Sequence, residues 1–240
     1  MCGRFAMDLD PHMVQTKLES HGFKIEKSEG PEKVHPGLNK APQSFSMIYC
    51  QSKNSDKTEL VAMKWSLQPH WTKEPLKYPT FNTRCESLKP LKTTWRSATH
   101  RRGILAMQGY YEWDQHDHLP YYIHGHDLLY CLIIWDSNPQ LGDSPTFSIV
   151  TEPASPRLKK IHERMPVIVA TRAEAELWTQ GSWPGVLDLI EPNDGLDYHR
   201  VAKDVNKVGI EKPGLNSPLK ESHIKTISDF FPKKRKTNED

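Results

Sequence analysis

Cys2 directly follows Met1, and this position gives it a chemistry that an internal cysteine lacks. Removal of Met1 leaves a residue that carries a thiol and a free α-amine, a 1,2-aminothiol. The reference pKa of an α-amine is about 7.7–8.0, so a useful fraction is neutral at physiological pH and can attack an aldehyde to form a Schiff base. The thiol can then close intramolecularly onto the imine carbon and form a five-membered thiazolidine. Cys2 therefore predicts reaction with aldehydes rather than amides, although a cysteine at position two can also occur by chance.

The other cysteines predict neither a metal site nor a disulfide. Cys50 and Cys131 lie in apolar runs, which is typical of buried core thiols, and no CxxC pair is present. The N-terminus lacks the apolar segment of a secretory signal, so we expect a reducing compartment in which disulfides do not persist. We expect no metal ion and no other cofactor.

The composition predicts a globular domain. The 240 residues are 36% hydrophobic and 26% charged, and 32 basic against 30 acidic side chains leave a net charge of +2. This balance excludes a histone-like polycation but not a local basic groove. There is no stretch of about 18 apolar residues, so we expect no membrane-spanning helix. We expect a monomer.

Short apolar runs rich in Ile, Val, Tyr and Trp are separated by clusters of Gly, Pro, Asn and Asp, which is typical of strands. We expect strands at 46–50, 60–65, 104–113, 121–124, 128–135, 147–151 and 166–170. Helices are expected at 11–21, 155–164, 171–181 and 199–206, two of them from the start signals Ser155-Pro156 and Thr171 with Glu174. Many strands and few helices predict an α+β fold with a curled, barrel-like, mainly antiparallel sheet flanked by short helices. The composition changes after Val208, so we expect one domain at 1–208 and a flexible tail at 209–240.

Six segments in this domain resemble the motifs of one family, and they occur in the family's order. Together they resemble the SRAP-domain family of abasic-site processing proteins. The segments are Met1–Phe5 (MCGRF), Asn39–Pro42 (NKAP), Trp65–Trp71 (WSLQPHW), Phe81–Glu86 (FNTRCE), Gly109–Trp113 (GYYEW) and Ile161–Pro166 (IHERMP).

The resemblance implies that this protein crosslinks through Cys2 to abasic sites in single-stranded DNA, whose ring-opened sugar is an aldehyde. It implies that Glu112 moves protons at the amine and the sugar, and that His162 protonates the sugar ring oxygen. Asn82 would bind the sugar or position the Cys2 amine. The remaining implied positions would face DNA, with phosphate clamps at Arg4 and Arg84, a wedge between bases at Pro42 and Trp71, and further contacts at Asn39 and Trp113.

Each of these residues also has a plainer interpretation. Glu112 could be a surface carboxylate on a strand, and His162 could be a solvated side chain beside Lys and Arg. Asn39 and Asn82 could be turn residues, and the tryptophans are more often core than ligand platforms.

The sequence departs from the family pattern at four places. Ser66 replaces the usual Gly, Tyr110 stands where Phe is common, Ala106-Met107-Gln108 stands where the family typically has Pro-Ala-Asp, and Cys85 replaces a frequent Ser. None of these changes removes a proposed catalytic group.

The tail contains a degenerate sliding-clamp motif. Ile227, Phe230 and Phe231 have the spacing of a PCNA-interacting peptide, although Ile224 stands where that motif has Gln. The basic run 233–236 is compatible with nuclear import. The tail therefore predicts a nuclear protein with the clamp as a partner, while a segment that packs back on the domain is the alternative.

Two other functions remain open from the sequence. One is a cysteine-type peptidase with Cys2 as N-terminal nucleophile, for which Cys2, His162 and Glu112 could be drawn as a triad. The other is a non-covalent reader of modified bases in DNA. A peptidase needs only the thiolate and a reader needs no thiol, whereas a crosslinker needs both the thiol and the amine.

Overall fold

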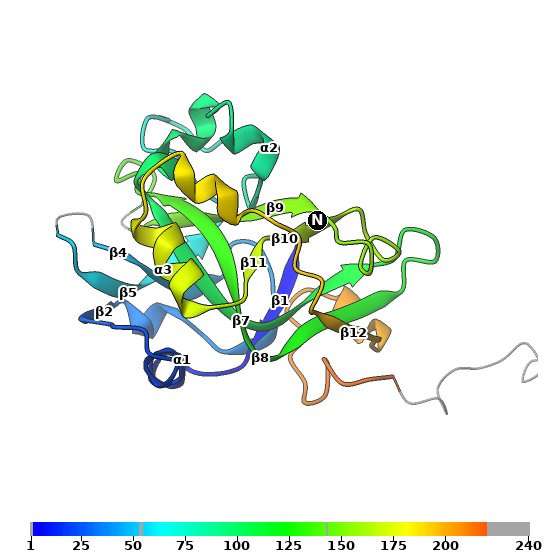
Figure 1. Ribbon diagram of the computed structural model, residues 1–240. Coiled ribbons are helices and arrows are strands. Elements are labelled where there is room, and N and C mark those ends of the chain that lie inside the picture. Colours follow the sequence, from blue (N-terminus) through cyan, green and yellow to red (C-terminus); the bar gives the residue numbers. More distant parts are fainter. Residues whose placement is uncertain (1, 53–54, 143, 220–240) are drawn as a thin grey trace, which may run out of the picture.

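The computed structural model describes residues 2–52, 55–142 and 144–219. Within these residues twelve strands join in one sheet, and the α-helices lie around its outside (Figure 1). The strands are β1 (Arg4–Met7), β2 (Lys27–Glu29), β3 (Gly37–Lys40), β4 (Phe45–Gln51), β5 (Thr58–Trp65), β6 (Asn82–Arg84), β7 (Arg102–Trp113), β8 (Pro120–Asp136), β9 (Thr146–Pro153), β10 (Arg164–Pro166), β11 (Ile168–Val169) and β12 (Asp197–Arg200). The helices are α1 (Pro11–Ser20), α2 (Cys85–Leu88) and α3 (Arg172–Gln180), with short 3-10 helices η1 (Pro31–Lys33), η2 (Thr93–Thr99), η3 (Gly185–Leu189) and η4 (Lys203–Asn206). Among the described helices, none has the length and apolar character needed to cross a bilayer.

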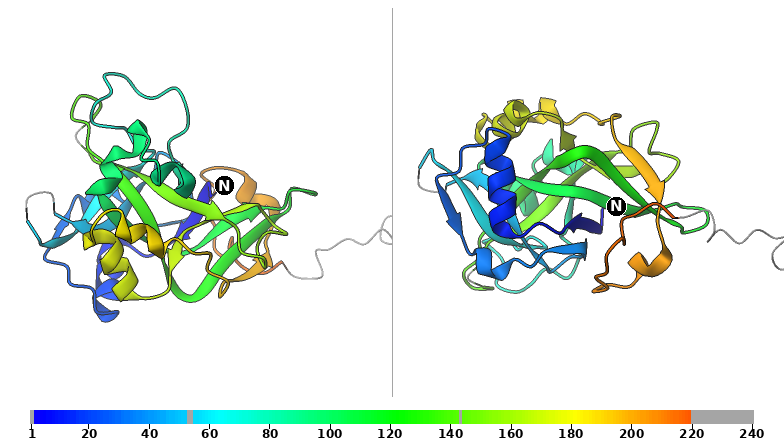
Figure 2. Two further views of the ribbon diagram at one scale, coloured as in Figure 1. Left: turned by 45° about the horizontal axis from the view of Figure 1, so that its top comes forward. Right: turned by 90° about the horizontal axis from the view of Figure 1, so that it is seen from below.

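Five strands form a closed ring of pairings. β7 pairs with β8, β8 with β9, β9 with β5, β5 with β4, and β4 with β7 again. The long, curved strands β7 and β8 of this ring are the green arrows in both views of Figure 2. Most pairs are antiparallel, whereas β5–β9, β6–β9 and β2–β5 are parallel. The α+β class with a curled, mainly antiparallel sheet is therefore confirmed.

The core of the ring is apolar and aromatic. Trp65 is fully buried, stacks on Phe147 at 6.3 Å and contacts Phe5 at 5.2 Å between ring centroids. Phe5 belongs to β1, which pairs with both β7 and β3. The ring and its aromatic contacts thus fix β1, and with it the position of Cys2 two residues before that strand.

Two helices form where local signals placed them. The side chain of Asp10 accepts a hydrogen bond from the Met13 amide at the start of α1, with Pro11 in the first turn. Thr171 and Glu174 form the reciprocal capping box of α3.

The helices predicted at 155–164 and 199–206 are wrong, two predicted strands are joined into one, and the strand predicted at 166–170 is divided between β10 and β11. Residues 155–161 form hydrogen-bonded turns rather than a helix, because the chain must reverse from β9 into β10 within ten residues. The predicted strands 121–124 and 128–135 are one strand, β8. The predicted helix at 199–206 is β12 followed by η4, because Tyr198 and His199 pair with β8. Tertiary pairing outweighs local propensity at this site.

Gly109 permits a close approach between β7 and β8. A Cβ atom on Gly109 would lie 2.5 Å from the Tyr122 ring and 2.6 Å from the Ile123 carbonyl oxygen. The register of the two strands shifts between Met107 and Gly109. This irregularity determines to which face of the sheet each side chain from Tyr110 to Trp113 points.

Ser66 adopts a backbone conformation that favours glycine. Its φ angle is 120°, and the side chain is buried. Such a conformation costs roughly 1–3 kcal/mol in a residue with a Cβ atom. We expect Ser66→Gly to raise the free energy of unfolding by about 1 kcal/mol in urea titrations. Ser66→Ala is the control, since it keeps the Cβ atom; equal stabilisation by both variants would contradict a backbone origin.

Residues 201–219, here called the strap, pack against the sheet after β12. Leu215 and Val205 are buried in a small cluster with Ala6 and Tyr111. The Leu219 amide donates a hydrogen bond to the Arg200 carbonyl at 2.8 Å. The orange chain beside β12 in Figure 1 is part of this strap. The tail expected from residue 209 therefore makes structural contacts at least as far as Leu219.

Candidate active site

Cys2 lies in the interior, held by Asn82. The Cys2 side chain is fully buried, and Asn82 Nδ2 donates a hydrogen bond to the Cys2 carbonyl oxygen at 2.8 Å. Asn82 begins β6, which pairs with β9 opposite Ile149. The other amide atom, Asn82 Oδ1, is buried and accepts no hydrogen bond from the described residues. Asn82 thus positions the backbone of Cys2, and its side-chain oxygen stays available to accept a hydrogen bond.

Glu112 and Tyr110 lie around Cys2. Glu112 is buried near the end of β7, and β1 pairs with β7 through Arg4 opposite Tyr111 and Phe5 opposite Tyr110. Burial raises the pKa of the Tyr110 phenol, and the charges of Cys2 and Glu112 add to that rise. The sheet therefore brings together Cys2, Asn82 and Glu112, three residues that the family resemblance assigned to one site.

The Cys2 thiol is held in its neutral form. Burial raises its pKa well above the ordinary cysteine value, and the charge of Glu112 raises it further. A thiolate nucleophile needs the opposite environment, a neighbouring cation or a helix N-terminus. The surroundings of Cys2 therefore oppose formation of a thiolate.

Glu152, a second buried carboxyl group, was not predicted from the sequence. It lies in β9 with a side chain only 1% exposed, and its Oε1 has no hydrogen-bond partner among the described residues. Burial raises its pKa to about 8; Arg164 opposes this rise, and Glu191 and Glu86 add to it. The charge of Glu152 also adds to the raised pKa values of Tyr110 and Cys131, which are due mainly to burial. The signal in the sequence is an acidic residue directly after the apolar run of a strand.

Glu152 makes stability depend on pH. Its carboxyl group stays protonated in the folded chain up to about pH 8 and ionises near pH 4.3 when unfolded, so folding is stabilised at low pH and weakened as pH rises between these values. We expect Glu152→Gln to lose less stability than wild type between about pH 5 and about pH 8.5, by a few kcal/mol at most. Urea unfolding at both pH values measures this, with the exposed Glu163→Gln as control. Parallel pH curves for wild type and Glu152→Gln would contradict the assignment.

His162, Arg84 and Arg164 lie at the carboxyl ends of β6 and β9. His162 Nδ1 accepts a hydrogen bond from the Arg164 amide at 3.0 Å, and His162 is half-buried on the turn before β10. Arg84 is exposed at the end of β6. Arg164 makes a bidentate ion pair with Glu86 at 2.7 and 2.9 Å, and Glu86 also accepts a weak hydrogen bond from the Cys85 thiol. Burial and Glu86 raise the pKa of that thiol to about 11.

Arg4 and Asn39 bind the strap and each other. Arg4 Nη1 donates to Asn39 Oδ1 at 2.8 Å and to the Val205 carbonyl at 2.9 Å, and the guanidinium lies 5.9 Å from the Trp113 ring centroid. Asn39 is buried and donates to the Lys207 carbonyl at 2.8 Å. The Trp113 indole donates to Asn206 Oδ1 at 2.7 Å. These three residues form one side-chain network, and their contact with DNA stays a prediction.

Pro42 and Trp71 lie on two separate turns. Pro42 is half-buried between β3 and β4 and lines an open cavity of about 680 Å³ with Lys40 and Val208. Trp71 is 47% exposed on the turn after β5, which Asn138 holds through the Pro69 and Thr72 carbonyls. An exposed tryptophan is available for stacking. The wedge role of this pair also stays a prediction.

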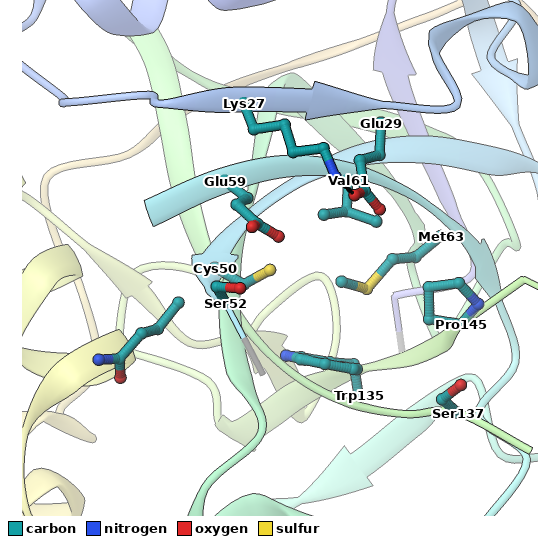
Figure 3. A pocket seen from close by; sticks show the side chains of 11 residues that line it. Lys27, Glu29, Cys50, Ser52, Glu59, Val61, Met63, Trp135, Ser137 and Pro145 are labelled. Atoms are coloured by element: carbon teal, nitrogen blue, oxygen red, sulfur yellow. Dashed lines mark hydrogen bonds and ion pairs between the residues drawn. The ribbon is translucent and has the colours of Figure 1, made fainter. Parts of the chain in front are cut away.

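A further cavity of about 330 Å³ lies between β2, β4, β5 and the end of β8. Trp135, Cys50 and Met63 line it, with Glu59 and the Lys27–Glu29 ion pair at its edge (Figure 3). None of the residues around Cys2 lines this cavity. No group of three or more His, Cys, Asp or Glu side chains in the described ranges is arranged to hold a metal ion.

The predicted clamp residues Ile227, Phe230 and Phe231, the basic run 233–236 and Met1 lie outside the described residues. Clamp binding, nuclear import and removal of Met1 therefore stay predictions.

A family model described as SOS response associated peptidase (SRAP) matches residues 1–208. The chain belongs to the SRAP family. Several proteins named abasic site processing proteins are similar along most of this chain. The abasic site processing protein of Saccharomyces cerevisiae is 28% identical over 276 residues, covering 100% of this chain and 73% of its own. The abasic site processing protein YoqW of Bacillus subtilis is 28% identical over 239 residues, covering 93% of this chain and 100% of its own.

Solved structures share the fold of this chain. A protein from Bacteroides thetaiotaomicron superposes with a TM-score of 0.73 at 20% identity, covering 91% of this chain and all of its own. A phage-related protein from Bordetella bronchiseptica gives a TM-score of 0.65 at 20% identity, covering 83% of this chain and 94% of its own.

Proposed function

We propose that this protein processes abasic sites in single-stranded DNA by forming a covalent thiazolidine crosslink through Cys2 after Met1 is removed. The observation that carries the proposal is the buried cluster of Cys2, Asn82 and Glu112, in which the thiol is kept neutral beside a carboxyl group. The relatives named abasic site processing proteins support the substrate class.

The reaction begins at the α-amine of Cys2. The neutral amine adds to the aldehyde of the ring-opened sugar and loses water to give an imine. The thiol then adds to the imine carbon, its proton passes to the nitrogen, and the ring closes. One water molecule leaves overall, so the crosslink needs no oxidant or reductant.

Glu112 and His162 would move the protons in these steps. Glu112 would accept the proton of the Cys2 thiol as sulfur adds, and would return it to nitrogen. His162 would protonate the sugar ring oxygen, which favours the open aldehyde. Both steps can run backwards, so the crosslink can be reversible. The crosslink would shield the lesion from strand cleavage during replication and repair.

Arg4, Arg84, Asn39, Trp113, Pro42 and Trp71 would hold the DNA strand beside the lesion. Arg84 is exposed next to Asn82 in β6, which suits a phosphate contact. Arg4 and Asn39 already bind the strap, so their contribution would include shaping the surface around Trp113. In the tail, Ile227, Phe230 and Phe231 would bind the sliding clamp and the basic run would direct the protein to the nucleus.

The cysteine peptidase alternative fits this site less well. The family description names a peptidase, and Cys2 is the candidate nucleophile. A peptidase needs a thiolate, whereas burial and Glu112 oppose ionisation of this thiol. A lyase or auto-processing activity would use the same residues and forms part of the proposal.

A gel assay tests the proposed function. Single-stranded DNA containing one uracil is treated with uracil glycosylase and mixed with protein whose mass confirms an N-terminal Cys2. We expect an adduct that survives heating in denaturant, and none when the abasic aldehyde is first reduced to an alcohol. Absence of an adduct with the unreduced aldehyde, or equal yield with the alcohol, would overturn the proposal.

A further inference from the structure

Two histidines join the strap to the sheet outside the candidate active site. His124 in β8 and His199 in β12 are half-buried, with His124 Nε2 at 3.2 Å from His199 Nδ1. The outer nitrogens face carbonyl oxygens: His124 Nδ1 lies 3.0 Å from Gly125 O, and His199 Nε2 lies 2.8 Å from Asn216 O in the strap. The Tyr122 ring packs against both imidazoles.

The number of protons on the two imidazoles determines which of these three contacts are hydrogen bonds. A carbonyl oxygen only accepts hydrogen bonds, so His124 Nδ1 and His199 Nε2 must each carry a hydrogen. A neutral imidazole has one hydrogen, so two neutral rings leave bare lone pairs facing each other at the central contact. One added proton completes all three hydrogen bonds. Two added protons place N–H against N–H.

We propose that His124 and His199 share a single proton and thereby fasten the strap, acting as positioning residues for Arg4, Asn39 and Trp113. The strap reaches these side chains through the carbonyls of Val205 and Lys207 and through the side chain of Asn206. Glu211 of the strap also accepts hydrogen bonds from the Leu38 and Asn39 amides, at 2.6 and 3.1 Å.

The charged surroundings support one proton rather than two. Burial lowers the pKa of His199, and the like charge of His124 lowers it further, whereas the contact with Asn216 opposes the shift. Asp197, on the same strand as His199, is paired with Arg157 at 2.6 Å. Burial raises the pKa of Tyr122, whose ring packs against both imidazoles; the contact with Asn216 lowers that pKa, and the charge of Asp8 raises it. An opened strap therefore takes up more protons than a closed one, and the closed strap loses stability as pH falls below the ordinary histidine range.

Imidazole NMR on the full chain, uniformly labelled with ¹⁵N, tests the pair without DNA. Over about pH 4 to about pH 8.5 we expect His124 Nδ1 and His199 Nε2 to stay protonated while the two inner nitrogens titrate in two coupled steps. The second step should fall well below about pH 6.5. Two independent titrations near that value, or a hydrogen on His199 Nδ1 instead of Nε2 at high pH, would overturn the proposal.

Amide exchange at Leu219 reports the strap itself. After correction for intrinsic exchange, we expect wild type to lose protection by about tenfold when the second proton binds. His199→Gln should lose this pH response, while His126→Gln, an exposed site on β8 two residues after His124, should keep it. An unchanged response in His199→Gln would also overturn the proposal. Since no DNA is present, failure here leaves the proposed crosslinking chemistry untouched. If that chemistry holds, DNA binding should weaken in the same pH range.

Discussion

Cys2→Ser is expected to abolish the heat-stable adduct with abasic single-stranded DNA while the protein stays folded. The variant keeps the α-amine, so an imine still forms, but a serine hydroxyl is a much weaker nucleophile than sulfur toward the imine carbon. The imine reverts to aldehyde and amine unless it is reduced. The denaturing gel should therefore show no adduct, and borohydride should restore one.

The matched control is Cys85→Ser, because Cys85 directly follows β6, the strand that Asn82 begins. It should crosslink as wild type does. Blocking the α-amine of the wild-type chain should also abolish the adduct, which separates a crosslinker from a peptidase. A stable adduct from Cys2→Ser, or from the blocked chain, would contradict the proposed chemistry.

Glu112→Gln is expected to slow crosslinking by about 100-fold or more, the usual contribution of a positioned proton-transfer group. The amide keeps the size of the buried side chain but cannot accept the thiol proton. Removing the carboxylate also removes one cause of the raised pKa of Cys2, so that pKa should fall. The time course of adduct formation measures the rate, and the pH dependence of thiol alkylation at Cys2 measures the pKa.

The exposed Glu163→Gln is the control for charge alone. A purely structural role for Glu112 would lower the free energy of unfolding without a matching change in rate. An unchanged rate in a folded Glu112→Gln protein would contradict the proton-transfer role.

The sequence allowed the residues around Cys2 to be grouped because they lie in recognisable motifs on or before short strands. Cys2, Asn82 and Glu112 come from segments about 80 and 30 residues apart, and the structure brings them together through β1, β6 and β7. Their catalytic roles, and the DNA-facing roles of the other residues, stay predictions.

The strap could not be predicted, because the contacts that hold it to Arg4 and Asn39 run from side chain to backbone across about 170 to 200 residues and leave no periodic pattern. Its turn-rich composition favoured a linker. Glu152 was missed for a related reason, since only its burial between β10 and β6 makes it unusual. The joined strand β8 was missed because His124 to Asp127 is polar. Pairing with β7 holds the chain on both sides of this segment, with His124 opposite Gly109 and Leu129 opposite Met107.

The most direct measurement is the intact mass of the protein after reaction with a defined abasic oligonucleotide, followed by peptide mapping of the linkage. The proposed chemistry predicts the mass of the chain without Met1 plus that of the oligonucleotide minus one water, with the linkage at Cys2. An unmodified chain that carries a free N-terminal Cys2, or a linkage that maps to any other residue, would contradict it.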